Sequence, residues 1–408
     1  MRVKLARITG GFLPDDRRTG AVAAPTVRLA AAGFVATAIA FGPARMGFGL
    51  FLPDFRAEFA LSTTVAGLVA SGGFLAFLLG LPVAAWLGAR VGQRVPVMAG
   101  ALLAMAGFAV VATAADSTAL ALGIALAGAS AGFCWVPFND AAERVVPVSA
   151  RPATLSAVST GTTLGVAAAG ALALVVSAGA IDWRTAWGAF AIAGLVAALA
   201  AAVGVPGRRG TAPESVAAPP LLRRETLPLY GTALVFGATN AVYLSFAADR
   251  VAAEGGLAGL PDRATPAVIF LGYGLCGLVG LATGRLEARC GLAALLAAIF
   301  AAFAVSLTLV ALTPGSWPGI LASAGLHGAA VMTVSAVLSF WSLRLFAGHG
   351  SLGFTAALVA AAIGSALGPA LAGGLVDAIG PEWAFLTLAV PPLVVAIAFA
   401  TRPSPAGS

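Results

Sequence analysis

The sequence predicts an all-α membrane protein in which twelve transmembrane helices form two pseudo-symmetric six-helix bundles. Composition is the first reason: 60% of the 408 residues are hydrophobic and 10% are charged, whereas about 25% of residues are charged in an average soluble domain. The second reason is that the apolar residues fall into runs long enough to cross a bilayer, which takes about 20 residues per helix. The third is that short patterns recur between the two halves of the chain at nearly constant spacing.

Each uncharged apolar run predicts one helix, and charged or turn-forming residues separate the runs. The runs of the first half cover residues 29–53, with Arg45 as an interruption, 61–89, 95–115, 117–139, 152–181 and 185–207. Those of the second half cover residues 226–248, 264–284, 290–343, 345–376 and 383–401. The run 290–343 is too long for one crossing and divides at the Pro- and Gly-containing segment 313–318. The total is twelve helices.

The longest polar break, residues 205–225, is predicted to link two bundles at 29–204 and 226–401, with tails at 1–28 and 402–408. If the N-terminus is cytoplasmic, 18 basic residues fall in cytoplasmic segments and four in external ones. The positive-inside rule therefore predicts that both termini are cytoplasmic. The first 25 residues are polar and lack the apolar core of a cleavable signal. We expect a multi-pass protein of the inner (plasma) membrane.

Composition also argues against several function classes. Lys4 is the only lysine, so a phosphate-binding loop of the G-x-x-x-x-G-K-[ST] type, and with it ATP-driven pumping by this chain, is excluded. The arginines are scattered between apolar runs, which is typical of membrane flanks and not of a nucleic-acid interface. Two histidines and three scattered cysteines predict neither a metal site nor a disulfide framework, and no Gly-x-Ser-x-Gly elbow for a nucleophilic serine is expected. We therefore expect no enzyme activity, no cofactor and no metal.

Two patterns of the first half recur in the second. The pattern F-G-x-x-R-x-x-F at residues 41–48 corresponds to F-G-x-x-N-x-x-Y at 236–243, a shift of 195 residues. The pattern A-R-x-G at residues 89–92 recurs at 288–291, a shift of 199. Parallel repeats of this kind are typical of secondary transporters.

Twelve helices, a duplication of six helices, cytoplasmic termini and a basic loop after the second and eighth helices together resemble the major facilitator superfamily of transporters. The family's loop pattern G-x-x-x-D-R-x-G-R-R is matched here by Arg90, Gly92 and Arg94, and its second copy by Arg289 and Gly291. Alanine replaces the aspartate in both copies. The resemblance implies that these five residues belong to gating loops. It also implies two six-helix halves that expose a central site alternately to the two sides of the membrane.

Arg45 is the first candidate cargo residue, since it lies within the first predicted helix, about 6 Å past its middle at 1.5 Å per residue. An arginine at the centre of a span costs roughly 2.5–3.5 kcal/mol, and its planar fork suits the carboxylate or phosphate of a cargo. The alternatives are snorkelling to the outer interface, or a structural pair with Asp54 or another acid. Asn240 and Tyr243 occupy the corresponding places in the seventh helix, where they either bind cargo or join neighbouring helices. Trp135 either lines the same cavity or packs against its neighbours.

Asn139, Asp140, Glu143 and Arg144 cluster at the inner end of the fourth helix. Asn139 is a further candidate cargo ligand. Asp140 and Arg144 lie one helical turn apart and can pair locally. The alternative is an inner gate, in which Asp140 or Glu143 pairs with an arginine of the loop after the second helix.

His327 falls near the middle of the tenth predicted helix and is one of two histidines. It either carries a proton, as an imidazole can near neutral pH, or fills space between helices. No acidic residue falls at the middle of a predicted helix. Coupling to protons therefore depends on His327, on the outer acids Asp54 and Asp249, or is absent.

These observations predict a secondary active or facilitative transporter that moves a small organic solute by alternating access, with an anion favoured by Arg45. The alternative is a proton-coupled, polyspecific efflux pump for drugs or metabolites. A channel would normally assemble as an oligomer around repeated short spans, which the duplication argues against, so we expect a monomer. The expected partners are the small-molecule substrate, protons where transport is coupled, and the lipid bilayer, without nucleic acid.

Overall fold

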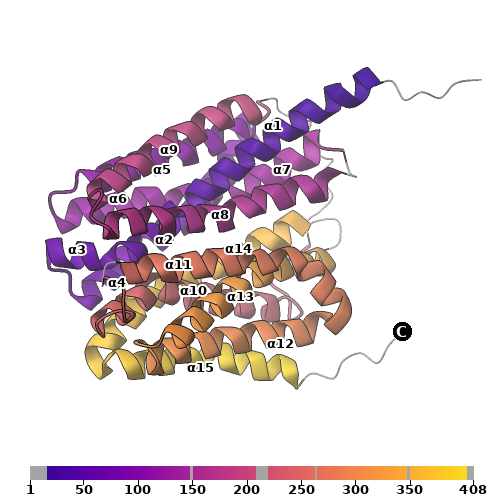
Figure 1. The fold of residues 1–408 in the computed structure, drawn as a ribbon. Coiled ribbons are helices and arrows are strands. Elements are labelled where there is room, and N and C mark those ends of the chain that lie inside the picture. The colour runs from indigo at the N-terminus through magenta and orange to yellow at the C-terminus, as the bar shows by residue number, and fades with distance from the viewer. Residues whose placement is uncertain (1–15, 148–149, 208–218, 262–263, 347–349, 402–408) are drawn as a thin grey trace, which may run out of the picture.

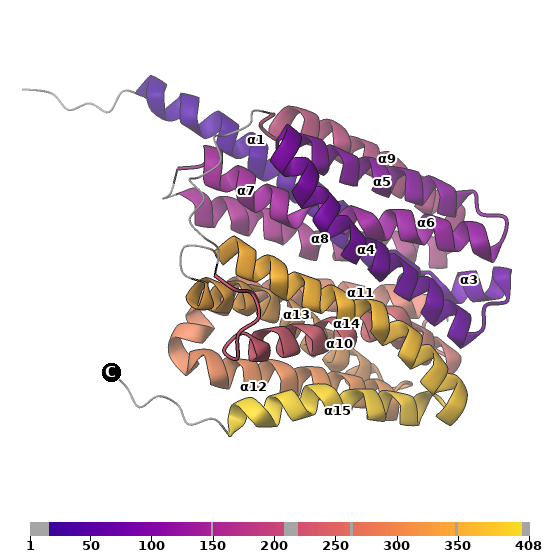
Figure 2. The same cartoon turned by 180° about the vertical axis from the view of Figure 1, so that it is seen from behind.

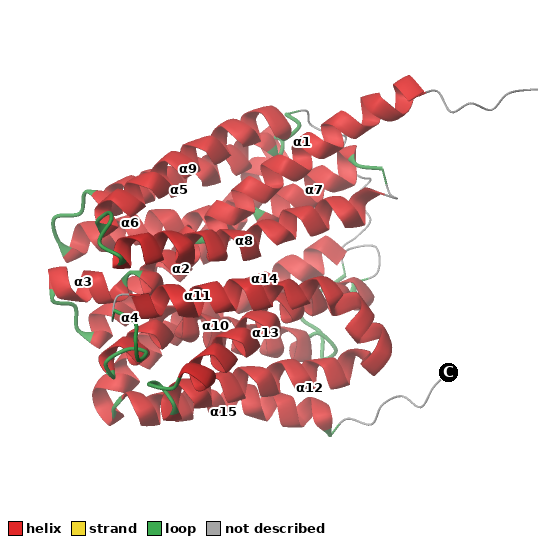
Figure 3. Cartoon of the chain, in the orientation of Figure 1, coloured by secondary structure: helices red, strands yellow, loops and turns green. Residues whose placement is uncertain are grey.

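The computed structural model describes residues 16–147, 150–207, 219–261, 264–346 and 350–401. The regular elements in these ranges are all helical, which confirms the predicted class (Figure 3). The first half of the chain contains α1 (Asp16–Phe41), α2 (Pro43–Leu50), α3 (Leu52–Phe59), α4 (Thr63–Val91), α5 (Arg94–Ala112), α6 (Ser117–Ala129), the 3-10 helix η1 (Ser130–Phe133), α7 (Trp135–Val145), α8 (Arg151–Ser177) and α9 (Trp183–Gly204). The second half contains α10 (Leu227–Ala253), α11 (Thr265–Cys276), the 3-10 helix η4 (Gly277–Ala282), α12 (Thr283–Leu312), α13 (Trp317–Leu345), α14 (Gly350–Ile379) and α15 (Pro381–Ala400).

Ten helical stretches in the described ranges are long and apolar enough to cross a membrane. One of them, Thr265–Leu312, has 48 residues, and at 1.5 Å per residue it is more than twice as long as a roughly 30 Å hydrocarbon core requires. It turns at Gly291, whose φ of 79° is not helical, and so supplies two crossings. The shorter apolar stretch Ser117–Phe133 continues into α7 and adds one more. The chain thus makes the twelve crossings that the apolar runs predict.

Two crossings are broken at positions that shape the site. α1 ends at Phe41 and α2 begins at Pro43, because Gly42 leaves the helical region and Pro43 has no N–H to continue the hydrogen-bond ladder. The fourth crossing, predicted as one helix, changes to a 3-10 helix at Ser130–Phe133. The first break places Arg45 in the first turn of α2, at the inner face of the bundle.

Four side chains define where helices begin at one end of the molecule. Ser62, Asp116, Asp182 and Ser316 are the N-caps of α4, α6, α9 and α13, and each accepts a hydrogen bond from a backbone N–H in the first turn. Such caps satisfy N–H groups that have no partner within the helix. The bond from the backbone N–H of Thr185 lowers the pKa of the Asp182 carboxyl.

The long helices form two layers (Figure 1). Helices α1 and α5–α9 lie in one layer and α10–α15 in the other, while α4 runs along α14, as the view from behind also shows (Figure 2). The described start of α1 and the end of α15 lie at the same end of the molecule, as an even number of crossings requires. We call this the terminal end, and the opposite end the α3 end.

The sequence repeat is also a repeat in packing. A Cβ atom on Gly42 would lie 2.7 Å from the carbonyl oxygen of Gly165 in α8, and one on Gly237 would lie 1.9 Å from the carbonyl oxygen of Ala361 in α14. Gly42 and Gly237 are separated by the shift of 195 residues that the sequence patterns show. Small residues of this kind let helix backbones approach closely in a membrane. The first and fifth crossings therefore pack as the seventh and eleventh do.

The outer faces of the helices carry large apolar side chains. Leu68, Ile192, Leu199, Val203 and Leu371 are each more than half exposed. Soluble monomers rarely expose contiguous apolar surface on this scale, whereas lipid chains solvate it. The chain is a multi-pass membrane protein.

Candidate functional site

A pocket lies between the two halves, beside the break that separates α1 from α2. The space among its side chains measures about 400 Å³, including the part open to solvent. Helices α2, α4, α6 and η1 line it from the first half and α10 from the second. The lining residues are Ala44, Arg45, Phe48, Gly49, Ala70, Gly73, Phe74, Phe77, Ile124, Gly128, Ala131, Leu244 and Ser245. Of these residues, Arg45 alone is charged.

Arg45 is held mainly by aromatic rings. Its guanidinium carbon lies 5.0 Å from the ring centre of Phe77, 5.3 Å from that of Phe74 and 5.7 Å from that of Phe41. Across the interface between the halves, Nη2 donates to the hydroxyl oxygen of Ser365 on α14 at 3.4 Å. The Nε atom is buried and has no hydrogen-bond partner among the described residues.

The charge of Arg45 has no carboxylate at ion-pair distance in the part of the chain that the structure describes. Ser365 offers it a lone pair, since the Ser365 hydroxyl donates its proton to the carbonyl of Gly237 at 3.1 Å. Ring faces contribute roughly 0.5–2 kcal/mol each to such a cation, and a bidentate carboxylate is a stronger and more directional partner. The pocket therefore presents a guanidinium fork whose donors are weakly used.

Trp135 supports this pocket from outside. Its ring meets Phe41 edge-on with the ring centres 6.0 Å apart, and Phe41 in turn contacts Arg45. Asn139 belongs to the same helix, α7, but its side chain lies outside the part that the structure describes. Trp135 thus stands one layer behind the pocket lining.

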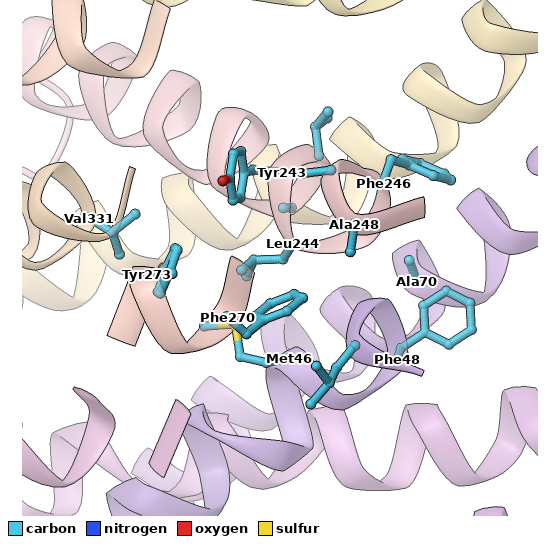
Figure 4. Packing of buried hydrophobic residues seen from close by; sticks show 14 of the residues in the cluster. Met46, Phe48, Ala70, Tyr243, Leu244, Phe246, Ala248, Phe270, Tyr273 and Val331 are labelled. Atoms are coloured by element: carbon cyan, nitrogen blue, oxygen red, sulfur yellow. The ribbon is translucent and has the colours of Figure 1, made fainter. Parts of the chain in front are cut away.

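Asn240 and Tyr243, the two candidate residues of the seventh helix, contact the interior of the second half. Asn240 is buried and accepts a hydrogen bond from the Tyr273 hydroxyl at 3.2 Å. Tyr243 lies on the side of α10 that faces away from Phe48, whereas Leu244 lies toward the first half (Figure 4). Successive helical residues differ by about 100° in direction, so a shift of one residue changes which side chain lines the pocket. In α10 the lining residues are Leu244 and Ser245.

His327 is the centre of a buried group of polar and aromatic side chains that we call the His327 cluster, formed with Tyr243, Tyr273, Ser306 and Ser323. The imidazole stacks on Tyr243 with the ring centres 3.8 Å apart and lies 6.0 Å from the ring of Tyr273. Its Nδ1 is 3.1 Å from the Ser306 hydroxyl, and Ser323 donates to the Tyr243 hydroxyl at 3.3 Å. Nε2 has no hydrogen-bond partner within the described ranges. The cluster stands beside the Arg45 pocket and does not line it.

The two basic loops share one backbone geometry. Gly92 has φ and ψ of 89° and 169°, and Gly291 has 79° and 163°, a region that essentially only glycine adopts. Arg90 lies over the ring of Trp86 at 4.2 Å, while Arg289 is exposed. The correspondence between the loops thus extends from sequence to backbone conformation.

At the terminal end of α7, the neutral side chain of Gln93 bonds the carboxylate of Asp140. Asp140 accepts a hydrogen bond from Gln93 Nε2 at 3.0 Å, and Arg94 donates to a backbone carbonyl at the end of α9 at 2.7 Å. The side chains of Glu143 and Arg144 are exposed. These bonds lie within the first half and fasten its loop to its own helices.

Polar contacts join the halves from the pocket toward the α3 end. Next to the pocket, the backbone N–H of Ala370 donates to the Ser71 hydroxyl at 2.9 Å. Further out, Thr64 donates to Asp377 through its backbone N–H at 3.1 Å and through its hydroxyl. Both contacts connect α4 with α14.

The outermost contact is an ion pair between Arg56 and Asp249. Sequence reasoning singled out Asp249 as an outer acid without its partner, and it also missed Phe74, Phe77 and Ser365 around Arg45. The two phenylalanines could have been predicted to share one face of α4, because they are three residues apart. The sequence could not predict which helix each of these side chains contacts.

The expectation that no Gly-x-Ser-x-Gly pattern is present is wrong, because residues 128–132 form such a sequence. Ser130 lies in η1, where its hydroxyl donates to the carbonyl of Ala127 at 2.6 Å and is buried. A nucleophilic serine of this type is exposed on a turn between a strand and a helix, whereas the described residues on both sides of Ser130 are helical.

Comparison with known sequence families and solved structures supports this architecture. The sequence profile of the Major Facilitator Superfamily matches residues 33–282. The crystal structure of a point mutant of the nucleoside transporter NupG is similar with a TM-score of 0.74 and 12% identity, covering 92% of this chain and 99% of that chain. A second NupG crystal structure has a TM-score of 0.68 and 12% identity, covering 92% and 98%. No curated protein sequence matches the chain. The structural likeness shows a shared fold, and the profile covers more than half of the sequence: the chain belongs to the Major Facilitator Superfamily of transporters.

Proposed function

We propose that this transporter carries a small organic anion through the Arg45 pocket by alternating access of its two halves. Family membership makes the chain a membrane transporter of a small molecule, and the anion is our addition. The observation that supports it is the setting of Arg45: a cation at the interface between the halves, among three ring faces and one hydroxyl. A cargo carboxylate or phosphate supplies the partner that the described residues do not.

Cargo in this pocket contacts both halves at once. Arg45 and Phe48 belong to the first half, and Leu244 and Ser245 to the second. The free energy of binding then depends on how the halves sit relative to each other, because each arrangement offers different contacts. A ligand can bias a two-state equilibrium only through such a difference in affinity, which is the requirement for a transport cycle.

We also propose that both termini are cytoplasmic in the inner membrane, since basic residues concentrate in the segments on that side. The α3 end then faces outward. In that orientation the contacts of Ser71, Thr64 and Arg56 with the second half hold the outer side closed.

A polyspecific efflux pump is the second candidate function. The aromatic lining by Phe48, Phe74 and Phe77 favours lipophilic cargo. The single charge of the lining is positive, however, and a cationic drug placed beside Arg45 is repelled. An exporter built on this pocket would therefore favour acidic lipophilic compounds.

The proposal is tested by ligand screening followed by substitution of Arg45. Purified protein is screened by thermal shift against carboxylates, inorganic phosphate, sugars and cationic drugs, since a ligand of the folded state raises apparent stability. For the anion that binds, Arg45→Lys keeps the charge and removes the planar fork, and we expect at least tenfold weaker binding, about 1.4 kcal/mol. Arg45→Ala should weaken binding further.

Arg184→Lys is the matched control, because Arg184 pairs with Glu58 at the α3 end, away from the pocket. It should bind the anion as wild type does. Monodisperse Arg45 variants that retain wild-type affinity would show that Arg45 is structural, and the anion proposal would be wrong.

A further inference from the structure

The lining of the Arg45 pocket is specific enough to indicate which class of anion it takes, an inference that rests on the proposed function. We infer that the cargo is an amphipathic monoanion: one carboxylate-like group that binds Arg45, attached to an uncharged apolar body that occupies the rest of the pocket. Short- to medium-chain fatty acids and aromatic monocarboxylates have this chemistry.

The charge of the pocket is the first argument. Arg45 is the one charged residue among the lining side chains, and its neighbours Phe41, Phe74 and Phe77 present rings to it. A second negative charge on the cargo would lie against apolar carbon without a cation to balance it. Burying an unpaired charge is among the costliest arrangements in a protein. Dicarboxylates and doubly charged phosphates are therefore disfavoured.

The scarcity of hydrogen-bonding groups is the second argument. Apart from Arg45, the lining offers one hydroxyl, that of Ser245, and otherwise carbon side chains. A sugar or a nucleoside brings several hydroxyl or amide groups, each of which loses its hydrogen bonds to water in such a pocket. The pocket thus differs in chemistry from what a polyhydroxylated cargo needs, although the fold is shared with nucleoside transporters.

The shape of the apolar part is the third argument. Gly73 of α4 and Gly128 of α6 pack closely, since a Cβ on Gly128 would lie 2.3 Å from the carbonyl oxygen of Gly73, and both residues line the pocket. Ile124 lies beside them: its Cγ2 lies 3.1 Å from where a Cβ on Gly73 would stand. This close contact and the Ile124 side chain bound the apolar part of the pocket, and we infer that they limit the length of the hydrocarbon chain or ring that it takes.

The test uses full-length purified protein and a chemically graded set of probes. Hexanoate is compared with hexanamide, which lacks the charge, with adipate, which adds a second carboxylate, and with uridine. We expect hexanoate and benzoate to bind, and the other three to bind at least tenfold more weakly. In the series from acetate to octanoate, each methylene that the lining covers should tighten binding about fourfold, which corresponds to ~0.8 kcal/mol.

Two variants and one control test where in the pocket the apolar body of the cargo binds. Ile124→Ala enlarges the pocket and should move the best chain length upward, whereas Ala70→Val narrows it and should move the best length downward. Ile299→Ala removes the same atoms from a buried site in α12, outside the pocket lining, and should leave the preference unchanged. If Ile124→Ala does not fold, the Ala70→Val comparison still decides the direction.

The outcomes separate this inference from the proposed function. Adipate or phosphate that binds as tightly as hexanoate and loses affinity in Arg45→Lys would overturn the monoanion class while the anion function stands. Uridine or hexanamide that binds as tightly as hexanoate would overturn both, because neither carries a charge. No detectable binding of any monocarboxylate at millimolar concentrations would overturn the monoanion class as well. Hexanoate binding that is equal in wild type, Arg45→Lys and Arg45→Ala would refute the proposed role of Arg45 itself.

Discussion

Arg56 on α3 and Asp249 on α10 form an ion pair across the two halves, with Nε and Oδ1 2.9 Å apart. Both side chains are partly shielded, at 26% and 18% exposure. The Nε–H does not point at the carboxylate oxygen, since Nε has no hydrogen-bond partner among the described residues, so the attraction is mainly one of charge. The pair closes the α3 end beyond the contact of Thr64 with Asp377.

Breaking this ion pair should open the α3 end more often. Fully exposed ion pairs contribute about 0.2–1 kcal/mol, and this partly shielded pair should contribute at least the upper part of that range. We expect Arg56→Gln or Asp249→Asn to increase access from that end roughly two- to fivefold. The measurement is the labelling rate of a reporter cysteine at Ser245, in a background without native cysteines, by a membrane-impermeant thiol reagent. The charge-swapped double variant, Arg56→Asp with Asp249→Arg, is the control and should restore slow labelling. Equal rates in all four proteins would show that the pair does not hold the halves.

Proton coupling through His327 stays a prediction. The imidazole has one nitrogen engaged by Ser306 and one without a described partner, so a proton can be added without displacing a bond. In proteoliposomes, we expect His327→Ala to retain counterflow of the cargo while it reduces accumulation driven by a pH gradient. Ser306→Ala, which keeps the imidazole, is the matched control. If accumulation is unchanged in His327→Ala, the histidine serves only the packing of the His327 cluster.

The backbone at Gly291 should not tolerate a side chain. Its φ of 79° with ψ of 163° costs about 1–3 kcal/mol for any other residue, although a Cβ added at this position would have no other atom within 4 Å. Gly291→Ala should therefore lower the apparent Tm through backbone strain alone. Gly284→Ala is the control, since this helical glycine also has open space around it and alanine favours a helix by roughly 1 kcal/mol. A Tm for Gly291→Ala at or above that of Gly284→Ala would contradict the strain.

Membrane orientation can be checked directly. Eighteen basic residues on the terminal side against four on the other predict that reporters fused after residue 210 and after residue 408 are active only as cytoplasmic enzymes. A reporter inserted after Ala60, between α3 and α4, should behave in the opposite way. Activity of a periplasm-dependent reporter at either of the first two positions would reverse the orientation.

Most of the fold could be predicted from the sequence because every segment that crosses the lipid must satisfy its backbone hydrogen bonds internally. A run of about 20 apolar residues has to be helical there, and the runs identify all twelve crossings. The break before Arg45 was also predictable, since Gly42 and Pro43 both disfavour a continuous helix. The break at the 3-10 segment Ser130–Phe133 was predictable in part, since Pro137 has no N–H to bond the carbonyl of Phe133, four residues before it, but the 3-10 form of the segment was not. Its geometry comes from packing against neighbours.

The site was predictable only where a single residue was anomalous by itself. Arg45 is a charge inside an apolar run, and it is one of the residues that line the pocket. The repeat placed Asn240 and Tyr243 in the right helix but could not give the direction of their side chains. Contacts such as Thr64 with Asp377 join residues that are 313 positions apart, and no local pattern encodes such a pairing. Those contacts follow from how the two halves dock.

Because the Arg56–Asp249 pair lies at the edge of the protein, the salt concentration on that side of the membrane should affect the pair. Dissolved ions screen partly exposed charges over about 8–10 Å at physiological ionic strength, but they do not cross the lipid. The cation Arg45 is enclosed by rings and helices, so the same ions affect it little. Salt added to the compartment at the α3 end should therefore favour the arrangement that is open at that end, and the same salt in the other compartment should not. The ionic strengths of the two compartments thus act unequally on one protein.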